Sequence, residues 1–170
     1  MTDTAWIRLL LTRELASFAR ELELFPDESL IWSIAPGISN SAGTLALHVC
    51  GNLQHFVGAV LGGTGYVRNR ELEFSARGVP GEKLLAEIQE TTRVVDTVLS
   101  RLPGAALSPD FPDVPGGGRV STGLFLLHLV SHLAHHLGQA GYLRRILTGR
   151  NQSSGAIAIK ALSAAPSRSA

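Results

Sequence analysis

The stretch LHLVSHLAHHLGQ, residues 127–139, repeats leucine at helical spacing and holds four of the six histidines of the chain. It lies inside a longer apolar segment that predicts a helix over residues 122–147. At about 100° per residue, four imidazoles fall within one arc of about 100°: His128, His132, His135 and His136. Imidazoles on a core-facing arc are costly unless each finds a partner, so this face of the helix predicts a polar site.

Three further segments show helical periodicity, over residues 4–25, 41–61 and 80–102. Capping residues bound the four predicted helices: Asn40 or Ser41, Gly62, Pro80, Ser121 or Thr122, and Gly149. No convincing strand pattern competes, so the predicted fold class is all-α, most simply a four-helix bundle. The connection over residues 63–79 is long enough to run back along the bundle and join two parallel helices.

Length and charge limit the class of protein. The 170 residues suit one domain, which we place at residues 1–150, with a Ser-, Ala- and Gly-rich tail over residues 151–170. Fifteen basic residues against fourteen acidic ones argue against a nucleic-acid partner or a polybasic membrane anchor. The single cysteine, Cys50, excludes a disulfide framework and a cysteine-rich zinc site. No secretory signal or membrane span stands out, which predicts a cytoplasmic protein.

The histidine spacing points to a metal. His132 and His136 are four residues apart, about 6 Å along a helix, so their imidazoles can share one ion. A third ligand must come from the segment over residues 41–61, which offers His48 or His55, about 10.5 Å apart and therefore not both. Asn52 lies between them and could orient an imidazole. Three imidazoles leave coordination positions open, as in catalytic sites, and suit zinc or nickel.

A polar core network of histidines is the alternative to a metal site. The helix lacks the glutamate of a His-Glu-x-x-His peptidase. Cys50 should point away from His48, and Gln139 either faces the rim of a pocket or makes a packing contact. The long connection also carries four charged residues, which are Arg68, Arg70, Glu71 and Glu73. We expect them to be solvated or paired with one another. The alternative is that they contact an anionic cosubstrate or supply a general base.

Two stretches resemble the DinB/YfiT-like superfamily of metal-dependent helical bundle proteins. The first is residues 40–56, continuing to residues 65–71, and the second is residues 127–139 with the Tyr-Leu-Arg that follows at residues 142–144. The resemblance covers about residues 4–150 and implies an up-down-down-up bundle. It also implies the metal ligands, which are His48, His132 and His136. The remaining histidines, His55, His128 and His135, then become candidates to line the pocket or to support the ligands.

Several members of that superfamily are thiol S-transferases that use bacillithiol, mycothiol or glutathione, and many form homodimers. The leading hypothesis is therefore a metal-dependent enzyme that transfers a low-molecular-weight thiol to an electrophilic small molecule, with no catalytic residue assigned beyond the metal ligands. A metal-dependent hydrolase is the first alternative, because the ion could activate water instead. A non-catalytic, metal-binding, stress-related dimer is the second.

Overall fold

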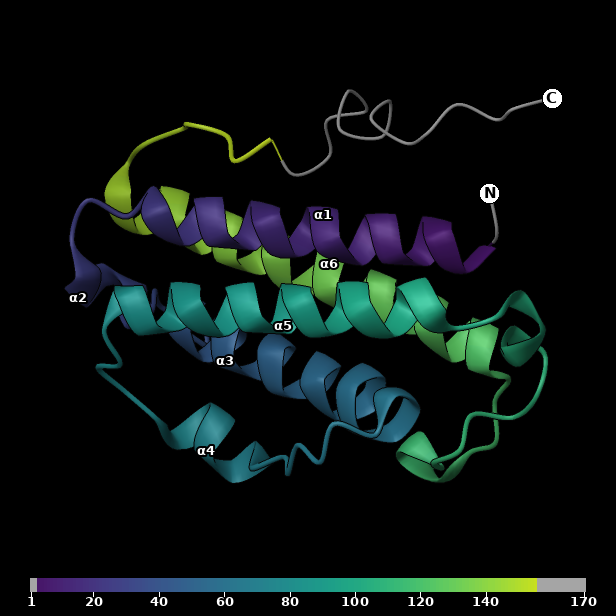
Figure 1. The fold of residues 1–170 in the computed structure, drawn as a ribbon. Helices are drawn as coiled ribbons and strands as arrows, with labels where there is room; N and C mark the ends of the chain where they lie inside the picture. The colour runs from purple at the N-terminus through teal and green to yellow at the C-terminus, as the bar shows by residue number, and fades with distance from the viewer. Residues whose placement is uncertain (1–2, 156–170) are drawn as a thin grey trace, which may run out of the picture.

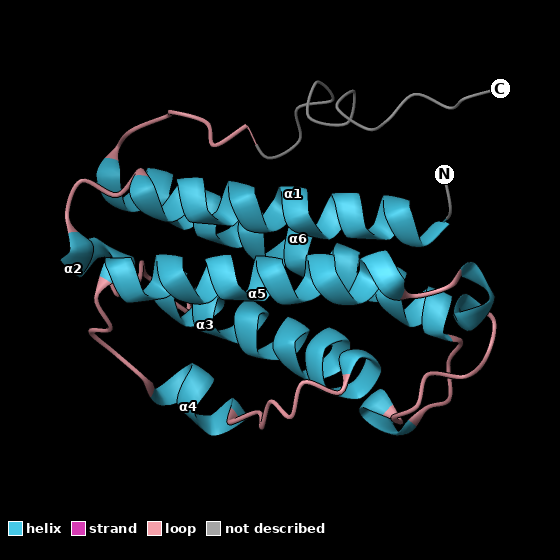
Figure 2. Ribbon diagram, in the orientation of Figure 1, coloured by secondary structure: helices cyan, strands magenta, loops and turns pink. Residues whose placement is uncertain are grey.

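The computed structural model describes residues 3–155, and within that range the protein is all-helical with no strand (Figure 2). The fold class predicted from the sequence is confirmed at this level. The long helices are α1 (Asp3–Glu23), α3 (Ala42–Leu53) with its continuation η1 (Gln54–Leu61), α5 (Gly81–Arg101) and α6 (Thr122–Thr148). The short ones are α2 (Glu28–Ile31), α4 (Arg70–Ser75), η2 (Gly104–Leu107) and η3 (Pro115–Gly117).

The long helices lie side by side, and each contacts two neighbours. Helix α1 packs on α5 and α6, and α3 packs on the same two helices from the other side (Figure 1). Helices α3 and α5 run in one direction while α1 and α6 run in the opposite one. The connection that carries α4 therefore runs back along the length of the protein and lies against α3. This placement brings its charged residues beside the histidines of α3.

Local signals fix the ends of the helices that carry histidines. The Ser41 hydroxyl accepts from the Thr44 backbone N–H at 3.1 Å, and the Ser121 hydroxyl accepts from that of Leu124 at 3.4 Å. Gly149 ends α6 in the left-handed region at φ 65°, which a residue without Cβ adopts without strain. These ends agree with those predicted from the sequence.

The second predicted helix differs from expectation in its last two turns. It begins as an α-helix but widens into a π-helix from Gln54 to Leu61. A π-helix has hydrogen bonds from residue i to i+5, so side chains along it turn away from the face that α-helical spacing assigns them. His55 lies in this segment. The face shared by His48 and His55 was predicted for an α-helix throughout, which holds only up to Leu53.

The core forms where the long helices meet. Leu11, Leu15 and Phe18 of α1 are fully buried, as are Leu126 of α6 and Val95 of α5. Burial of one such side chain contributes about 1.5–3 kcal/mol, so this shared core dominates the packing of the helices. His48 of α3 is buried beside this core, where Glu73 of the α4 connection lies against it.

Within residues 3–155, one helix is long and apolar enough to cross a membrane, contrary to the expectation that no such segment exists. It runs over Ala42–Leu61 with mean hydropathy 1.2, and 67% of it is buried inside the protein. Core helices of water-soluble proteins have the same composition, because they are apolar on every face that packs. The burial of this helix therefore explains its hydropathy without a membrane.

The segment after α6 is attached by two arginines. The Arg20 Nε donates to the backbone carbonyl of Ser154 at 2.8 Å, and Arg144 donates to that of Gln152. The first residues of the predicted tail over 151–170 thus pack against α1 and α6. The rest of that tail, residues 156–170, lies outside the described residues.

Candidate metal centre

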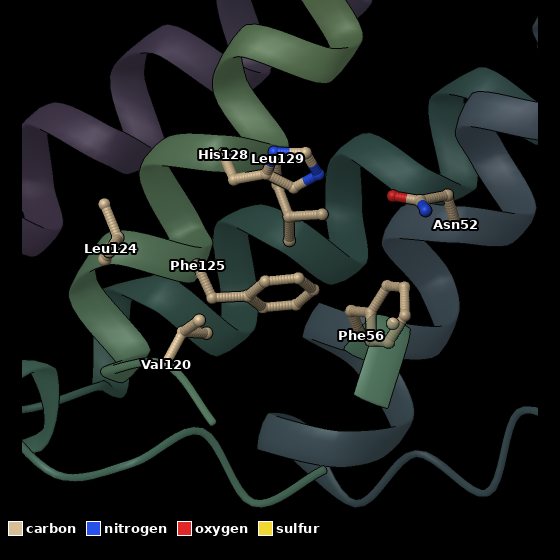
Figure 3. A pocket seen from close by; sticks show the side chains of 8 residues that line it. Asn52, Phe56, Val120, Leu124, Phe125, His128 and Leu129 are labelled. Carbon is tan, nitrogen blue, oxygen red and sulfur yellow. The ribbon is translucent and has the colours of Figure 1, made fainter. Parts of the chain in front are cut away.

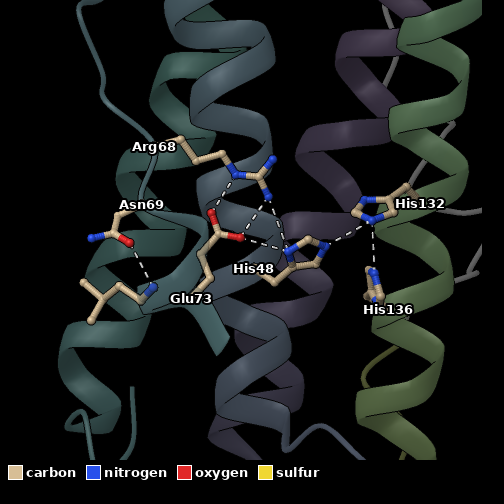
Figure 4. Close-up of polar contacts among 7 residues, drawn as sticks. His48, Arg68, Asn69, Glu73, His132 and His136 are labelled. Atoms are coloured by element: carbon tan, nitrogen blue, oxygen red, sulfur yellow. Dashed lines mark hydrogen bonds and ion pairs between the residues drawn. The ribbon is translucent and has the colours of Figure 1, made fainter. Parts of the chain in front are cut away.

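Three imidazoles from two facing helices meet at one point (Figure 4). The Nε2 of His132 on α6 lies 3.2 Å from the Nε2 of His48 on α3, and 3.1 Å from the Nε2 of His136 one turn along α6. The candidate ligand atoms all lie within 4.8 Å of one another. The structure therefore brings together the two α6 histidines that the helical spacing pairs and selects His48, not His55, as the third.

Hydrogen bonds to the Nδ1 atoms of His48 and His136 determine which nitrogen of each ring carries the proton. The Nδ1 of His48 lies 2.9 Å from a carboxylate oxygen of Glu73, which can only accept, so Nδ1 is the protonated atom. The Nδ1 of His136 lies 2.8 Å from Oε1 of Gln139, whose amide nitrogen lies 2.9 Å from the Nε2 of His135. Both hydrogen bonds leave an Nε2 lone pair aimed at the common point.

This arrangement of lone pairs fits a cation. The Nε2 of His132 can carry at most one proton, so it can donate to only one of the two lone pairs that face it. Without a cation the other pair of nitrogens stays in close, unfavourable contact. A divalent ion between the rings satisfies all three nitrogens together. His48, His132 and His136 therefore fit the metal that their spacing and the superfamily resemblance imply.

The electrostatic environment keeps the two ligands of α6 neutral. Burial, reinforced by the neighbouring His136 and His48, lowers the pKa of His132 to about 4. Burial also lowers the pKa of His136, although the hydrogen bond that His136 donates to Gln139 acts in the opposite direction. A protonated imidazole cannot bind a metal. At neutral pH these two rings are thus in the protonation state that metal binding requires.

Glu73 of α4 is the support of His48 that sequence reasoning missed. Its carboxylate is buried and accepts from Arg68 Nε at 2.7 Å and from an Arg68 terminal nitrogen at 2.8 Å. Burial raises the pKa of Glu73, but the hydrogen bonds from Arg68 and His48 outweigh it, and the net effect is to lower that pKa. Glu73 is therefore an ionised acceptor, which strengthens the His48 hydrogen bond and raises the basicity of the ring.

A glycine makes room for this carboxylate. A Cβ at Gly51, three residues after His48 on α3, would lie 2.2 Å from Oε1 of Glu73. Gly51 inside an apolar helix was the available sequence signal, because glycine in a helix interior often marks a close approach. Of the four charged residues of the connection, Arg68 and Glu73 form a buried ion pair, while Arg70 and Glu71 are exposed.

The other predicted site residues have different positions. The ring of His128 stacks on that of His132, with centroids 5.9 Å apart. The ring of His135 meets that of His136 edge to face, with centroids 5.3 Å apart, and also bonds to Gln139. His55 lies away from the three nitrogens, with its Nε2 3.8 Å from a carboxylate oxygen of Asp113. Asn52 does not orient an imidazole as predicted, since its buried Oδ1 has no hydrogen-bond partner and Glu73 has that role.

Cys50 is a buried core residue, as expected. Burial raises the pKa of its thiol to about 12, so the group stays protonated and is unsuited to nucleophilic attack. The prediction that it points away from the metal ligands agrees with its position among core residues.

The all-helical fold and the three facing imidazoles agree with the resemblance to the DinB/YfiT-like superfamily. Within that class, residues 7–149 match the family model described as Mycothiol-S-transferase, and the chain belongs to this family. Neither the curated proteins nor the solved structures compared with the chain include a match.

Proposed function

We propose that this protein is a metal-dependent thiol S-transferase that joins mycothiol, or a closely similar low-molecular-weight thiol, to an electrophilic small molecule. Membership of the mycothiol S-transferase family supports the thiol. The single observation that supports a metal is the meeting of three Nε2 atoms. Two of these atoms are unprotonated, because the Nδ1 atoms of the same rings donate hydrogen bonds to Glu73 and Gln139.

His48, His132 and His136 would hold the ion, and three imidazole nitrogens suit zinc or nickel. A divalent ion in that position supplies one piece of chemistry, which is to lower the pKa of a thiol that binds beside it. The protein keeps His132 and His136 neutral and aims all three rings at one point. Glu73 fixes the His48 ring and is a poor general base, because both of its oxygens accept hydrogen bonds and its pKa is lowered.

The transfer itself is a substitution at carbon. A bond forms between the thiol sulfur and the electrophilic carbon while the bond from that carbon to the leaving group breaks. The leaving group departs with the bonding electron pair, and the thiol proton passes to solvent. No oxidant or reductant is needed, so the thiol, the electrophile and the metal-loaded protein suffice for the assay.

Elemental analysis and a transfer assay on tag-free protein test the proposal. We expect about one equivalent of zinc or nickel in the wild type, and its loss in His132→Ala. The matched control is His55→Ala, which removes a histidine of α3–η1 that lies outside the centre and should keep the metal. Wild type and control should conjugate mycothiol to monochlorobimane faster than His132→Ala does.

The products separate this proposal from its alternatives. Mycothiol should be preferred over bacillithiol and glutathione, and ester substrates should not be hydrolysed when thiol is absent. Thiol-independent hydrolysis would instead support the metal-dependent hydrolase. Metal retention without turnover on any electrophile would support the non-catalytic dimer. Absence of metal after zinc is added back, with His132→Ala behaving as wild type, would overturn the metal centre and all three functions.

We further propose that α1, α3–η1, α5 and α6 form an up-down-down-up four-helix bundle over residues 1–150, with a tail over residues 151–170. The opposite directions of the helix pairs support this. A homodimer in the cytoplasm is the proposed state of the protein, and light scattering after gel filtration measures its mass. A monomer at assay concentration would contradict the dimer.

A further inference from the structure

A cavity of about 480 Å³ has His128 in its wall, four residues before the candidate ligand His132 on α6 (Figure 3). It lies between α3–η1 and α6, and the connection that precedes α6 closes one side of it. This volume is typical of sites for small molecules. The residues that line it and bear on its chemistry are Asn52, Phe56, Leu124, Phe125, His128 and Leu129.

The walls of the cavity are mostly apolar and aromatic. The rings of Phe56 and Phe125 meet edge to face with centroids 4.9 Å apart, and Phe111 packs behind both. The ring of His128 stacks nearly parallel to that of Phe125, with an interplanar angle of 22°. Flat aromatic walls of this kind bind flat apolar molecules through dispersion and ring stacking.

The cavity joins the metal centre through two helical steps. Asn52 follows His48 by four residues on α3, and His128 precedes His132 by four residues on α6. Each step is about 6 Å along a helix axis. The stacked rings of His128 and His132 form a continuous surface that runs from the cavity to the metal centre. A molecule in the cavity therefore lies about one helical turn from the point where the three Nε2 atoms meet.

One polar atom in the cavity has no partner. Asn52 is only 8% exposed, and its Oδ1 is buried without a hydrogen bond. A buried acceptor left unpaired is unfavourable, and native proteins satisfy nearly all such groups. In Figure 3 the amide oxygen of Asn52 points toward the space in front of His128 and Phe125. A ligand that carries an N–H or O–H group would satisfy it.

We propose that this cavity is the subsite for the electrophilic cosubstrate, and that it selects flat apolar or aromatic molecules with an N–H or O–H donor that reaches Asn52 Oδ1. The assignment of the ligand as the electrophile rests on the proposed function. The chemistry of recognition rests on the cavity alone, namely its aromatic walls and the buried, unpaired Oδ1 of Asn52.

Binding of two matched aromatic probes to zinc-loaded protein, without thiol, tests this inference. Naphthol carries an O–H donor, and methoxynaphthalene has the same ring system without one. Because one net hydrogen bond corresponds to about a 2- to 10-fold change in affinity, wild type should bind naphthol tighter by that factor. Asn52→Leu keeps the volume and removes the acceptor, so it should bind both probes equally. Titration calorimetry or naphthalene fluorescence measures both constants.

Two further variants control the experiment. Asn151→Leu makes the same substitution at an exposed asparagine far from the cavity and should keep the naphthol preference. Leu124→Trp places a large ring at the mouth of the cavity, at a side chain that is 61% exposed, and should weaken both probes without unfolding the protein. Asn52→Leu should melt no lower than wild type, because it removes an unpaired buried amide.

The possible results separate this inference from the proposed function. If Asn52→Leu keeps the wild-type preference for naphthol, or Leu124→Trp binds both probes as wild type does, the subsite is refuted even when thiol transfer occurs. If the preference depends on Asn52 but no electrophile is conjugated, the cavity stands as a binding site and the transferase function is refuted. If both hold, naphthol should also inhibit transfer to monochlorobimane in wild type and inhibit Asn52→Leu less.

Discussion

Gly51→Ala is the substitution that tests most directly how α4 supports the metal centre. The added Cβ would lie 2.2 Å from Oε1 and 2.8 Å from Cδ of Glu73, whereas ordinary van der Waals contact begins at 3.4 Å. The carboxylate must therefore retreat by about 1.2 Å, judged from those two distances. Oε1 accepts from Arg68 Nε at 2.7 Å and Oε2 accepts from His48 Nδ1 at 2.9 Å, so a shift of the carboxylate by this amount disrupts its hydrogen bonds, including the one that holds His48.

Two effects of opposite sign determine the stability of this variant. Alanine in place of glycine inside a helix stabilises by about 0.5–1 kcal/mol. Loss of a hydrogen bond to a charged group destabilises by about 1.5–3 kcal/mol. The second effect is larger, so Gly51→Ala should be less stable than wild type by about 1–2 kcal/mol. Urea denaturation of the metal-free protein measures this difference.

The same variant should lose affinity for zinc. Removal of the group that orients a metal-binding histidine typically weakens metal affinity about 10- to 100-fold. Competition with a chromophoric chelator measures that loss. Gly138→Ala is the matched control, because a Cβ at Gly138 of α6 meets nothing within 4 Å. The control should be slightly more stable than wild type and should keep its zinc affinity. Wild-type zinc affinity and unchanged stability in Gly51→Ala would refute the proposed role of Glu73.

Two other regions give sharp expectations. Arg144 and Glu21 form an ion pair that is almost completely buried, with Nε of Arg144 2.7 Å from Oε1 of Glu21. Arg144→Met leaves the buried carboxylate without its partner, so urea denaturation should show a loss of stability of about 3–5 kcal/mol. Arg93→Met, which breaks an exposed pair, should change nothing measurable, and equal effects of the two variants would contradict the reasoning. The metal-free protein should lose stability as pH falls from 6.5 toward 4. In this range His132 binds a proton in the unfolded chain but not in the folded protein, where its pKa is about 4. Thermal melts should show a shallower slope in that window for His132→Leu, and an unchanged slope would count against a neutral buried His132.

Much of the fold was predictable because its signals are local. Leucine spacing, the Ser41 and Ser121 caps and the Gly149 stop act within a few residues, and they fixed the long helices within a few residues of their observed ends. The pairing of His132 with His136 was predictable for the same reason, since four residues along an α-helix always bring two side chains to one face.

Decisions between distant residues needed the tertiary structure. Helical spacing alone left His48 and His55 as alternatives, because spacing along one helix does not show which of them faces α6. The approach of α6 selects His48, and the helix widens into a π-helix before it reaches His55. Sequence periodicity cannot reveal such a widening, because it depends on hydrogen bonds that change register under packing.

By itself, the sequence determined an all-helical protein in which two histidines of one helix can share a metal. The tertiary structure decided what surrounds them, namely the buried Glu73 beneath His48 and the unpaired Asn52 in an aromatic cavity. The physical reason is range. Helix spacing and capping act over one or two turns, whereas Glu73 reaches His48 across 25 residues of chain, and only because α4 folds back over Gly51.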